Sequence, residues 1–87
     1  MHTEIRQHNV LSRMENILIG MRRCTQDTAR LSEINELLKS VRNYAGFIGK
    51  PDCDYGWIRT FIYYTRSRLI SLQFNPGATS AGKQIDA

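Results

Sequence analysis

Two stretches of this chain repeat their apolar residues at alternating intervals of three and four positions, a spacing that lines side chains along one face of an α-helix. In residues 5–24 the repeat consists of Val10, Met14, Ile17, Met21 and Cys24, with Leu11 and Leu18 beside it. In residues 31–48 it consists of Leu31, Ile34, Leu38, Val41, Ala45 and Ile48, with Leu37 and Tyr44 beside it. The pattern predicts two amphipathic helices that bury these rows.

The segment between the two repeats, TQDTAR in residues 25–30, is polar and predicts a tight connection. Asp27 or Thr28 is suited to cap the second helix, because a side-chain oxygen there can accept a hydrogen bond from an unpaired amide of the first turn. Two helices of similar length joined by a short turn are expected to form an antiparallel helical hairpin.

A third amphipathic helix is expected after the segment GFIGKPDCDYG in residues 46–56. Glycines and a proline in this segment would end the second helix near Ile48, and Asp52 or Asp54 would cap the third. In WIRTFIYYTRSRLISL, residues 57–72, one arc of the helix is apolar. This arc consists of Trp57, Ile58, Phe61, Ile62, Leu69 and Leu72.

Arg68 is a charged residue that falls within this apolar arc. A guanidinium group at such a position must be paired, stacked on a ring or extended past the edge of the core. We expect it to pair with Glu33 or Glu36 of the second helix, or to lie over Tyr64 or Trp57.

The three predicted helices indicate an all-α protein, a three-helix bundle built on the antiparallel hairpin. They form one domain over residues 1–74, and the small and polar residues 75–87 are expected to form a flexible tail. A chain of 87 residues buries only a small core. We therefore expect two copies to associate as a homodimer, which would enlarge the buried surface.

The charge balance is moderately basic, with 12 Lys and Arg residues against 8 Asp and Glu residues and a formal net charge of +4. The sequence shows no secretory signal pattern and no apolar run of about 18 residues, so a soluble, cytoplasmic protein that does not engage membranes is expected. In that compartment Cys24 and Cys53 are expected to be free thiols, with a single disulfide as the alternative.

Catalytic and metal-binding patterns are not found in the sequence. The two histidines, His2 and His8, lie near the amino terminus, and no spacing gives either a nucleophile or an orienting partner. Neither the short paired ligand spacings of zinc sites nor a phosphate-binding glycine loop occurs. We expect a protein that is not an enzyme and that uses no cofactor, metal ion or small-molecule substrate.

The basic residues of the first helix form a row of their own. This row again has intervals of three and four and contains no acidic residue: Arg6, Asn9, Arg13, Asn16, Gly20 and Arg23. At a rise of 1.5 Å per residue it extends over about 25 Å. The second helix has a weaker strip of Ser32, Asn35, Lys39, Arg42 and Asn43. Positive charge is thus concentrated on parts of the surface.

Such a surface suits the phosphates of duplex nucleic acid, which arginine binds bidentately and asparagine contacts without selecting a base. The predicted nucleic-acid-binding residues are Arg6, Asn9, Arg13, Asn16, Arg23, Lys39 and Arg42. Double-stranded RNA is expected before DNA, since its deep, narrow groove favours recognition by shape and charge. The third helix is expected to support the bundle, because a basic outer face is ordinary on a surface helix.

The alternative is a protein-binding regulator or inhibitor that docks on a partner protein. Its docking surface would be an exposed aromatic patch, since exposed apolar and aromatic groups mark protein interfaces. The residues predicted for this patch are Tyr44, Phe47, Tyr55 and Trp57.

Overall fold

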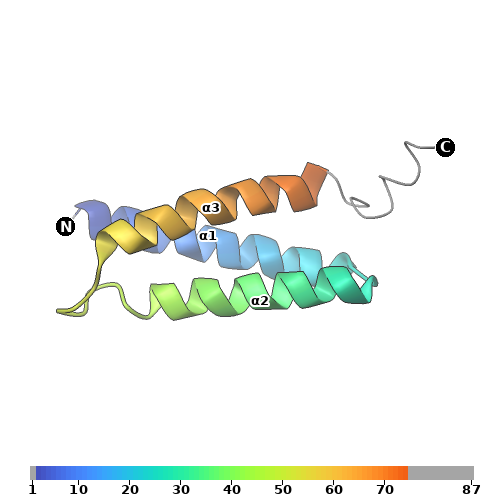
Figure 1. Cartoon of the computed structure of the whole chain (residues 1–87), viewed down its shortest axis with the longest axis horizontal. Helices are drawn as coiled ribbons and strands as arrows, with labels where there is room; N and C mark the ends of the chain where they lie inside the picture. Colours follow the sequence, from blue (N-terminus) through green and yellow to red (C-terminus); the bar gives the residue numbers. More distant parts are fainter. Residues whose placement is uncertain (1, 75–87) are drawn as a thin grey trace.

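The computed structural model describes residues 2–74, and these residues form three helices: α1 (His2–Cys24), α2 (Thr28–Ala45) and α3 (Tyr55–Phe74). Helices α1 and α3 run in the same direction, and α2 runs in the opposite direction (Figure 1). Helix α1 packs against both α2 and α3. The predicted all-helical class is confirmed, whereas the tail predicted for residues 75–87 lies outside the described residues.

Aspartates begin the second and third helices. Of the predicted alternatives, Asp27 caps α2, where its carboxylate accepts a hydrogen bond from the Ala29 amide at 3.2 Å. Asp54 caps α3, and its Oδ1 accepts hydrogen bonds from the amides of Gly56 and Trp57 at 3.0 and 3.1 Å. These bonds satisfy amides that have no partner within the helix.

The second helix ends earlier than expected, at Ala45 rather than near Ile48. The amide of Gly46 still donates to the Arg42 carbonyl, and the chain then turns through residues 46–52. Gly49 adopts φ = 90°, a left-handed conformation that glycine tolerates best. The glycines and the proline of this segment therefore form the predicted turn, which begins at Gly46, about three residues earlier than expected.

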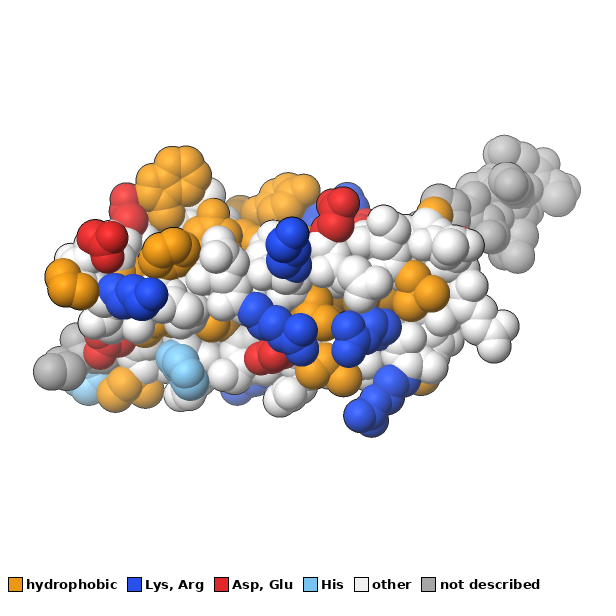
Figure 2. All heavy atoms as spheres, turned by 90° about the horizontal axis from the view of Figure 1, so that it is seen from below, with side chains coloured by type: hydrophobic (Ala, Val, Ile, Leu, Met, Phe, Trp, Pro, Cys, Tyr) orange, Lys and Arg blue, Asp and Glu red, His pale blue; other side chains and the backbone are white. Residues whose placement is uncertain are grey.

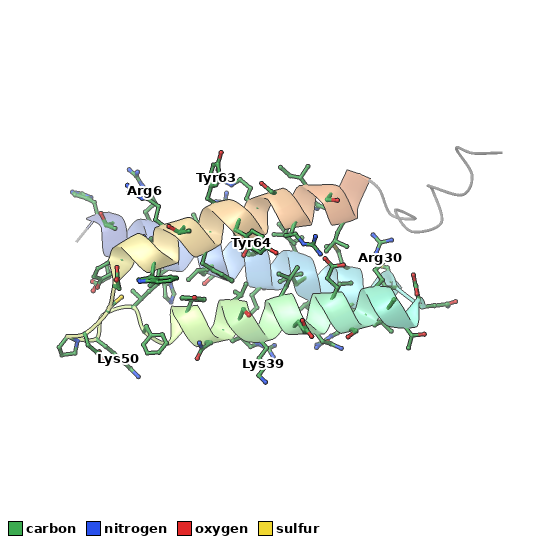
Figure 3. All side chains as sticks on the ribbon, in the orientation of Figure 1. Arg6, Arg30, Lys39, Lys50, Tyr63 and Tyr64 are labelled. Atoms are coloured by element: carbon green, nitrogen blue, oxygen red, sulfur yellow. The ribbon has the colours of Figure 1, made fainter. Side chains whose placement is uncertain are left out.

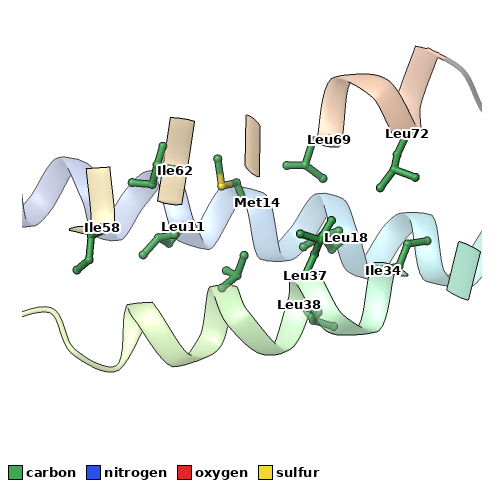
Figure 4. Close-up of a cluster of buried hydrophobic side chains, with 11 residues drawn as sticks. Leu11, Met14, Leu18, Ile34, Leu37, Leu38, Ile58, Ile62, Leu69 and Leu72 are labelled. Carbon is green, nitrogen blue, oxygen red and sulfur yellow. The ribbon is translucent and has the colours of Figure 1, made fainter. Parts of the chain in front are cut away.

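The core row of α2 agrees with its apolar repeat, since Ile34, Leu37, Leu38 and Val41 are buried. The core row of α1 differs from the prediction. Its buried side chains are those of Gln7, Leu11, Met14 and Leu18, the last three of which are seen in Figure 4. Of the row predicted to be buried, Met14 alone is, while Val10, Ile17 and Met21 are half-buried and Cys24 is exposed.

Gln7, the polar residue of this buried row, forms one long-range hydrogen bond, while its Oε1 has no partner among the described residues. The Gln7 side chain donates from Nε2 to the backbone carbonyl of Tyr55 at 3.0 Å, so a polar residue can occupy the buried row. Leu11 and Leu18, which follow Gln7 along the same face, then point into the core. Cys24 is a free thiol, as is the half-buried Cys53.

The buried row of α3 agrees with the predicted apolar arc at four of its six residues and differs at Trp57, Phe61 and Thr65. It consists of Ile58, Ile62, Thr65, Leu69 and Leu72. Trp57 was expected in the arc, but 65% of its surface is exposed. Thr65 is fully buried, and its hydroxyl finds no hydrogen-bond partner among the described residues. The buried row of α3 thus includes the polar Thr65, whereas the rings of Trp57 and Tyr64 are exposed.

Thr65→Val is expected to raise the free energy of unfolding by about 1 kcal/mol, because it removes an unpaired buried hydroxyl while keeping a branched side chain of similar size. Urea denaturation followed by circular dichroism measures the change. Thr60→Val is the matched control on the exposed side of the same helix, with an expected change within about 0.5 kcal/mol. A loss of stability in Thr65→Val would indicate that the hydroxyl is satisfied in solution.

Polar contacts hold α3 against the other helices near both ends. Arg68 pairs with Glu33, one of the predicted alternatives, and Arg30 donates to the Leu72 carbonyl near the carboxyl end of α3. At the opposite end the Tyr55 hydroxyl donates to Oε2 of Glu4 at 3.0 Å. This hydrogen bond to a carboxylate raises the pKa of the Tyr55 phenol above its ordinary value.

Candidate nucleic-acid interface

The predicted basic row of α1 is open to solvent along its whole length. Arg6, Asn9, Arg13, Asn16 and Arg23 are all exposed. Asn9 and Asn16 lie on the side of α1 opposite its buried row, and Arg6 and Arg13 lie between that side and the buried row. The ion pairs formed among residues 2–74 are those of Arg42 with Glu15 and of Arg68 with Glu33. No carboxylate in this part of the chain pairs with an arginine of the α1 row. These guanidinium groups are therefore available to an anion from outside the protein.

Two further arginines lie beside this row, on α3. On α1 the residues that directly precede the buried row are Arg6, Val10, Arg13 and Ile17; on α3 the residues that directly follow it are Arg59, Tyr63, Arg66 and Ile70. One residue turns a helix by about 100°. Helices α1 and α3 run parallel, and their buried rows face each other. The residues one position before the buried row of α1 and one position after that of α3 therefore point to the same side of the molecule.

We call this side, formed by Arg6, Arg13, Arg59, Arg66 and Tyr63, the basic face. Arg6 and Tyr63 both point away from α2, toward the same edge of the molecule (Figure 3). Tyr63 has 76% of its surface exposed. Within the part of the chain that the structure describes, the two rows contain no acidic residue. The basic face thus presents four guanidinium groups and a phenol from two helices.

A shallow, open depression lies on the surface around the first arginines. A hollow of about 380 Å³ is lined by His2, Ile5, Arg6, Asn9, Val10 and Arg13. Two guanidinium groups and an amide, all hydrogen-bond donors, border it. Arginine forks bind phosphate oxygens bidentately, and an amide can donate to a third oxygen. This part of the basic face can hold a phosphate group.

The predicted residues of α2 lie on another side of the molecule. Lys39 points to the edge opposite Arg6 (Figure 3). Arg42 is paired with Glu15 of α1, with 2.8 Å between its Nε and the carboxylate Oε2. Figure 2 looks at the α2 side and shows this mixture, with acidic groups among the lysines and arginines. The structure therefore separates Lys39 and Arg42 from the α1 row.

The sequence predicted a basic outer face on the third helix but did not assign it to the nucleic-acid-binding surface. Arg59, Tyr63 and Arg66 have intervals of four and three, and each follows a residue of the row of Ile58, Ile62 and Thr65. That row is hard to identify in the sequence because Thr65 is polar. The spacing of the arginines was a usable signal, but only the packing of α3 on α1 shows that they join the first row.

The aromatic residues predicted for protein docking lie on a different flank of α3. Tyr44, Phe47 and Trp57 line a hollow of about 190 Å³ together with Asp52, Asp54 and Ile58. We call it the aromatic hollow. The ring of Tyr44 also stacks on that of Phe61, with 4.3 Å between centroids. Tyr55, predicted for the same patch, instead contacts Glu4 and the Gly49 amide.

Other indicators of function are negative over residues 2–74. This region contains no cluster of three or more His, Cys, Asp or Glu side chains placed to hold a metal ion. None of its helices combines the length and apolarity that a membrane span requires. Comparison with protein-family models, curated proteins and solved structures finds no match for the chain.

Proposed function

We propose that this protein binds duplex nucleic acid through the basic face, double-stranded RNA in preference to DNA, and acts by occupying the duplex rather than by catalysis. One observation supports the proposal above the others. Arginines from two separate helices share one side of the molecule, and no described carboxylate accompanies them. An arrangement needed only for solubility would mix both signs of charge.

The shape of the basic face fits a phosphate backbone. Arg6 and Arg13 are separated by about 10 Å along α1, and the arginines of α3 lie to one side of that line. A duplex carries closely spaced phosphates on both sides of each groove. A face with charges in two rows can contact both strands, whereas a single row follows one.

The preference for RNA rests on the kind of groups presented. The exposed amides of Asn9 and Asn16 and the hydroxyl of Tyr63 can bond to sugar 2′-hydroxyl groups as well as to phosphates. Base edges of an RNA duplex are recessed in a deep, narrow groove, so proteins recognise it mainly by shape and backbone contacts. We expect little selectivity for base sequence.

A homodimer is part of the proposal. One protomer offers few phosphate contacts, and a net charge of +4 is modest for a nucleic-acid-binding protein. Two copies related by a twofold axis would present two basic faces and double the contacts.

Binding to a panel of duplexes at two salt concentrations tests the proposal. We expect retention of double-stranded RNA above double-stranded DNA, and weaker retention of single strands. With four phosphate contacts for each protomer, log K should fall with log salt with a slope of about −3 to −4 on DNA. Mass measurement in solution gives the number of copies bound. Binding that is absent, or insensitive to salt, would contradict the proposal.

A second candidate function is docking on a partner protein as a regulator or inhibitor. It is favoured by the exposure of aromatic rings at the aromatic hollow, where 65% of the surface of Trp57 and 40% of that of Phe47 is exposed. Exposed rings of this kind are typical of protein interfaces. The chemistry of the hollow indicates what such a partner presents.

A further inference from the structure

The aromatic hollow combines aromatic rings with carboxylates. The residues that line it include the aromatic Tyr44, Phe47 and Trp57 and the acidic Asp52 and Asp54. In Figure 2 this combination is visible at the end of the molecule near the amino terminus, where hydrophobic and acidic side chains gather. We infer that the hollow receives an arginine side chain from a basic segment of a partner protein.

The rings supply the first part of the argument. A cation is attracted to the face of an aromatic ring, most strongly to that of tryptophan, and arginine is found there more often than lysine. Stacking on Phe61 restrains the ring of Tyr44, one of the residues that line the hollow. The chain itself shows that a ring here accepts a cation, since Nζ of Lys50 lies 5.7 Å from the centroid of the Phe47 ring.

The carboxylates supply the second part. Asp54 is held in place because its Oδ1 accepts the two capping hydrogen bonds of α3. Neither Asp52 nor Asp54 forms an ion pair with any described residue, in contrast to Glu15 and Glu33. Two carboxylates and Lys50 leave the border of the hollow with a net negative charge, which a guanidinium group complements.

Other occupants fit less well. An apolar segment would cover the carboxylates without pairing them, which is costly. A phosphate would be repelled by Asp52 and Asp54. The volume of about 190 Å³ is smaller than that of ordinary ligand sites, so the hollow suits one side chain rather than a whole small molecule. The inference rests on the docking function and is independent of nucleic-acid binding by the basic face.

Trp57 makes the test direct, because it is the only tryptophan of the chain. Its indole signal in nuclear magnetic resonance spectra is followed while acetyl-Gly-Arg-Gly-amide is added, with the Gly-Gln-Gly peptide as control. We expect saturable shifts with the arginine peptide alone, with a Kd on the order of millimolar. Asp52→Asn should weaken binding by about two- to fivefold. Lys50→Met should strengthen it, because a competing cation is removed.

Tyr63→Ala, which removes an exposed ring on the basic face, should leave peptide binding unchanged. Equal responses to the two peptides, or an unchanged Kd in Asp52→Asn, would overturn the inference. Asp52 is exposed, so its substitution is compatible with folding. Duplex binding by Asp52→Asn, measured in parallel, should remain at least at the wild-type level. Failure of peptide binding alone would therefore be distinguished from failure of the nucleic-acid proposal.

Discussion

Replacing Leu18 by alanine is expected to lower the free energy of unfolding by about 3 to 5 kcal/mol. Leu18 is fully buried, and it points from α1 toward the other helices (Figure 4). Truncation removes apolar contacts and leaves a cavity that rigid neighbouring helices fill only in part. A domain of this size is stabilised by about 4 to 11 kcal/mol in total, so the loss is a large fraction of it.

Ile17→Ala is the matched control for this change and is measured in the same urea denaturation series. Ile17 precedes Leu18 and belongs to the row that the sequence predicted to be buried, but it is half-buried. We expect it to lose about 1 kcal/mol, well below the loss at Leu18. If Ile17→Ala were as damaging as Leu18→Ala, the side of α1 facing the core would be the one that the sequence predicted.

This pair of residues also shows why the core of α1 could be predicted only in part. Residues 7–21 contain two overlapping rows with the same spacing, and Met14 belongs to both. One row is wholly apolar and the other begins with Gln7, so hydropathy favours the first. The second row is the buried one, and its polar residue Gln7 forms one hydrogen bond, to the carbonyl of Tyr55, which is distant in sequence. Helix α2 has a single dominant row, and its core was predicted correctly.

The same ambiguity affects α3, where polar Thr65 lies in the buried row and Trp57 lies outside it. An apolar arc drawn from hydropathy takes in the tryptophan and omits the threonine. The sequence still predicted that Arg68 needs a partner, and Glu33 provides it. Local demands for pairing and capping are thus readable from sequence, whereas the rotation of a helix depends on which neighbour it meets.

For the candidate interface, the exposure of the α1 row was predicted from its polar residues, which repeat at intervals of three and four with no acidic residue among them. Its extension onto α3 was not, because that requires the direction and packing of two helices far apart in sequence. The ion pair of Arg42 with Glu15, which occupies a residue predicted to bind nucleic acid, could not be predicted for the same reason, since the two residues lie on different helices. Surfaces within one helix were predictable, and surfaces shared between helices were not.

Arg13→Glu combined with Arg66→Glu is expected to weaken binding to duplex RNA by at least about 100-fold. Arg13 represents α1 and Arg66 represents α3 on the basic face, so the pair tests whether both helices contact the duplex. Each substitution removes a charge-assisted hydrogen bond and places a carboxylate near phosphates. Both residues are exposed, so helical circular dichroism should be unchanged. Filter binding at low salt measures the loss.

Lys39→Glu combined with Lys50→Glu changes the net charge by the same amount and serves as the control. Both lysines point away from the side that carries Arg6 (Figure 3). If the basic face is the binding surface, this control should lose less than about fivefold, through the general field of the protein alone. Equal losses in the two double variants would show that net charge, rather than the arrangement of arginines on α1 and α3, governs binding. Comparison of the two double variants therefore distinguishes the effect of where the charges lie from the effect of net charge.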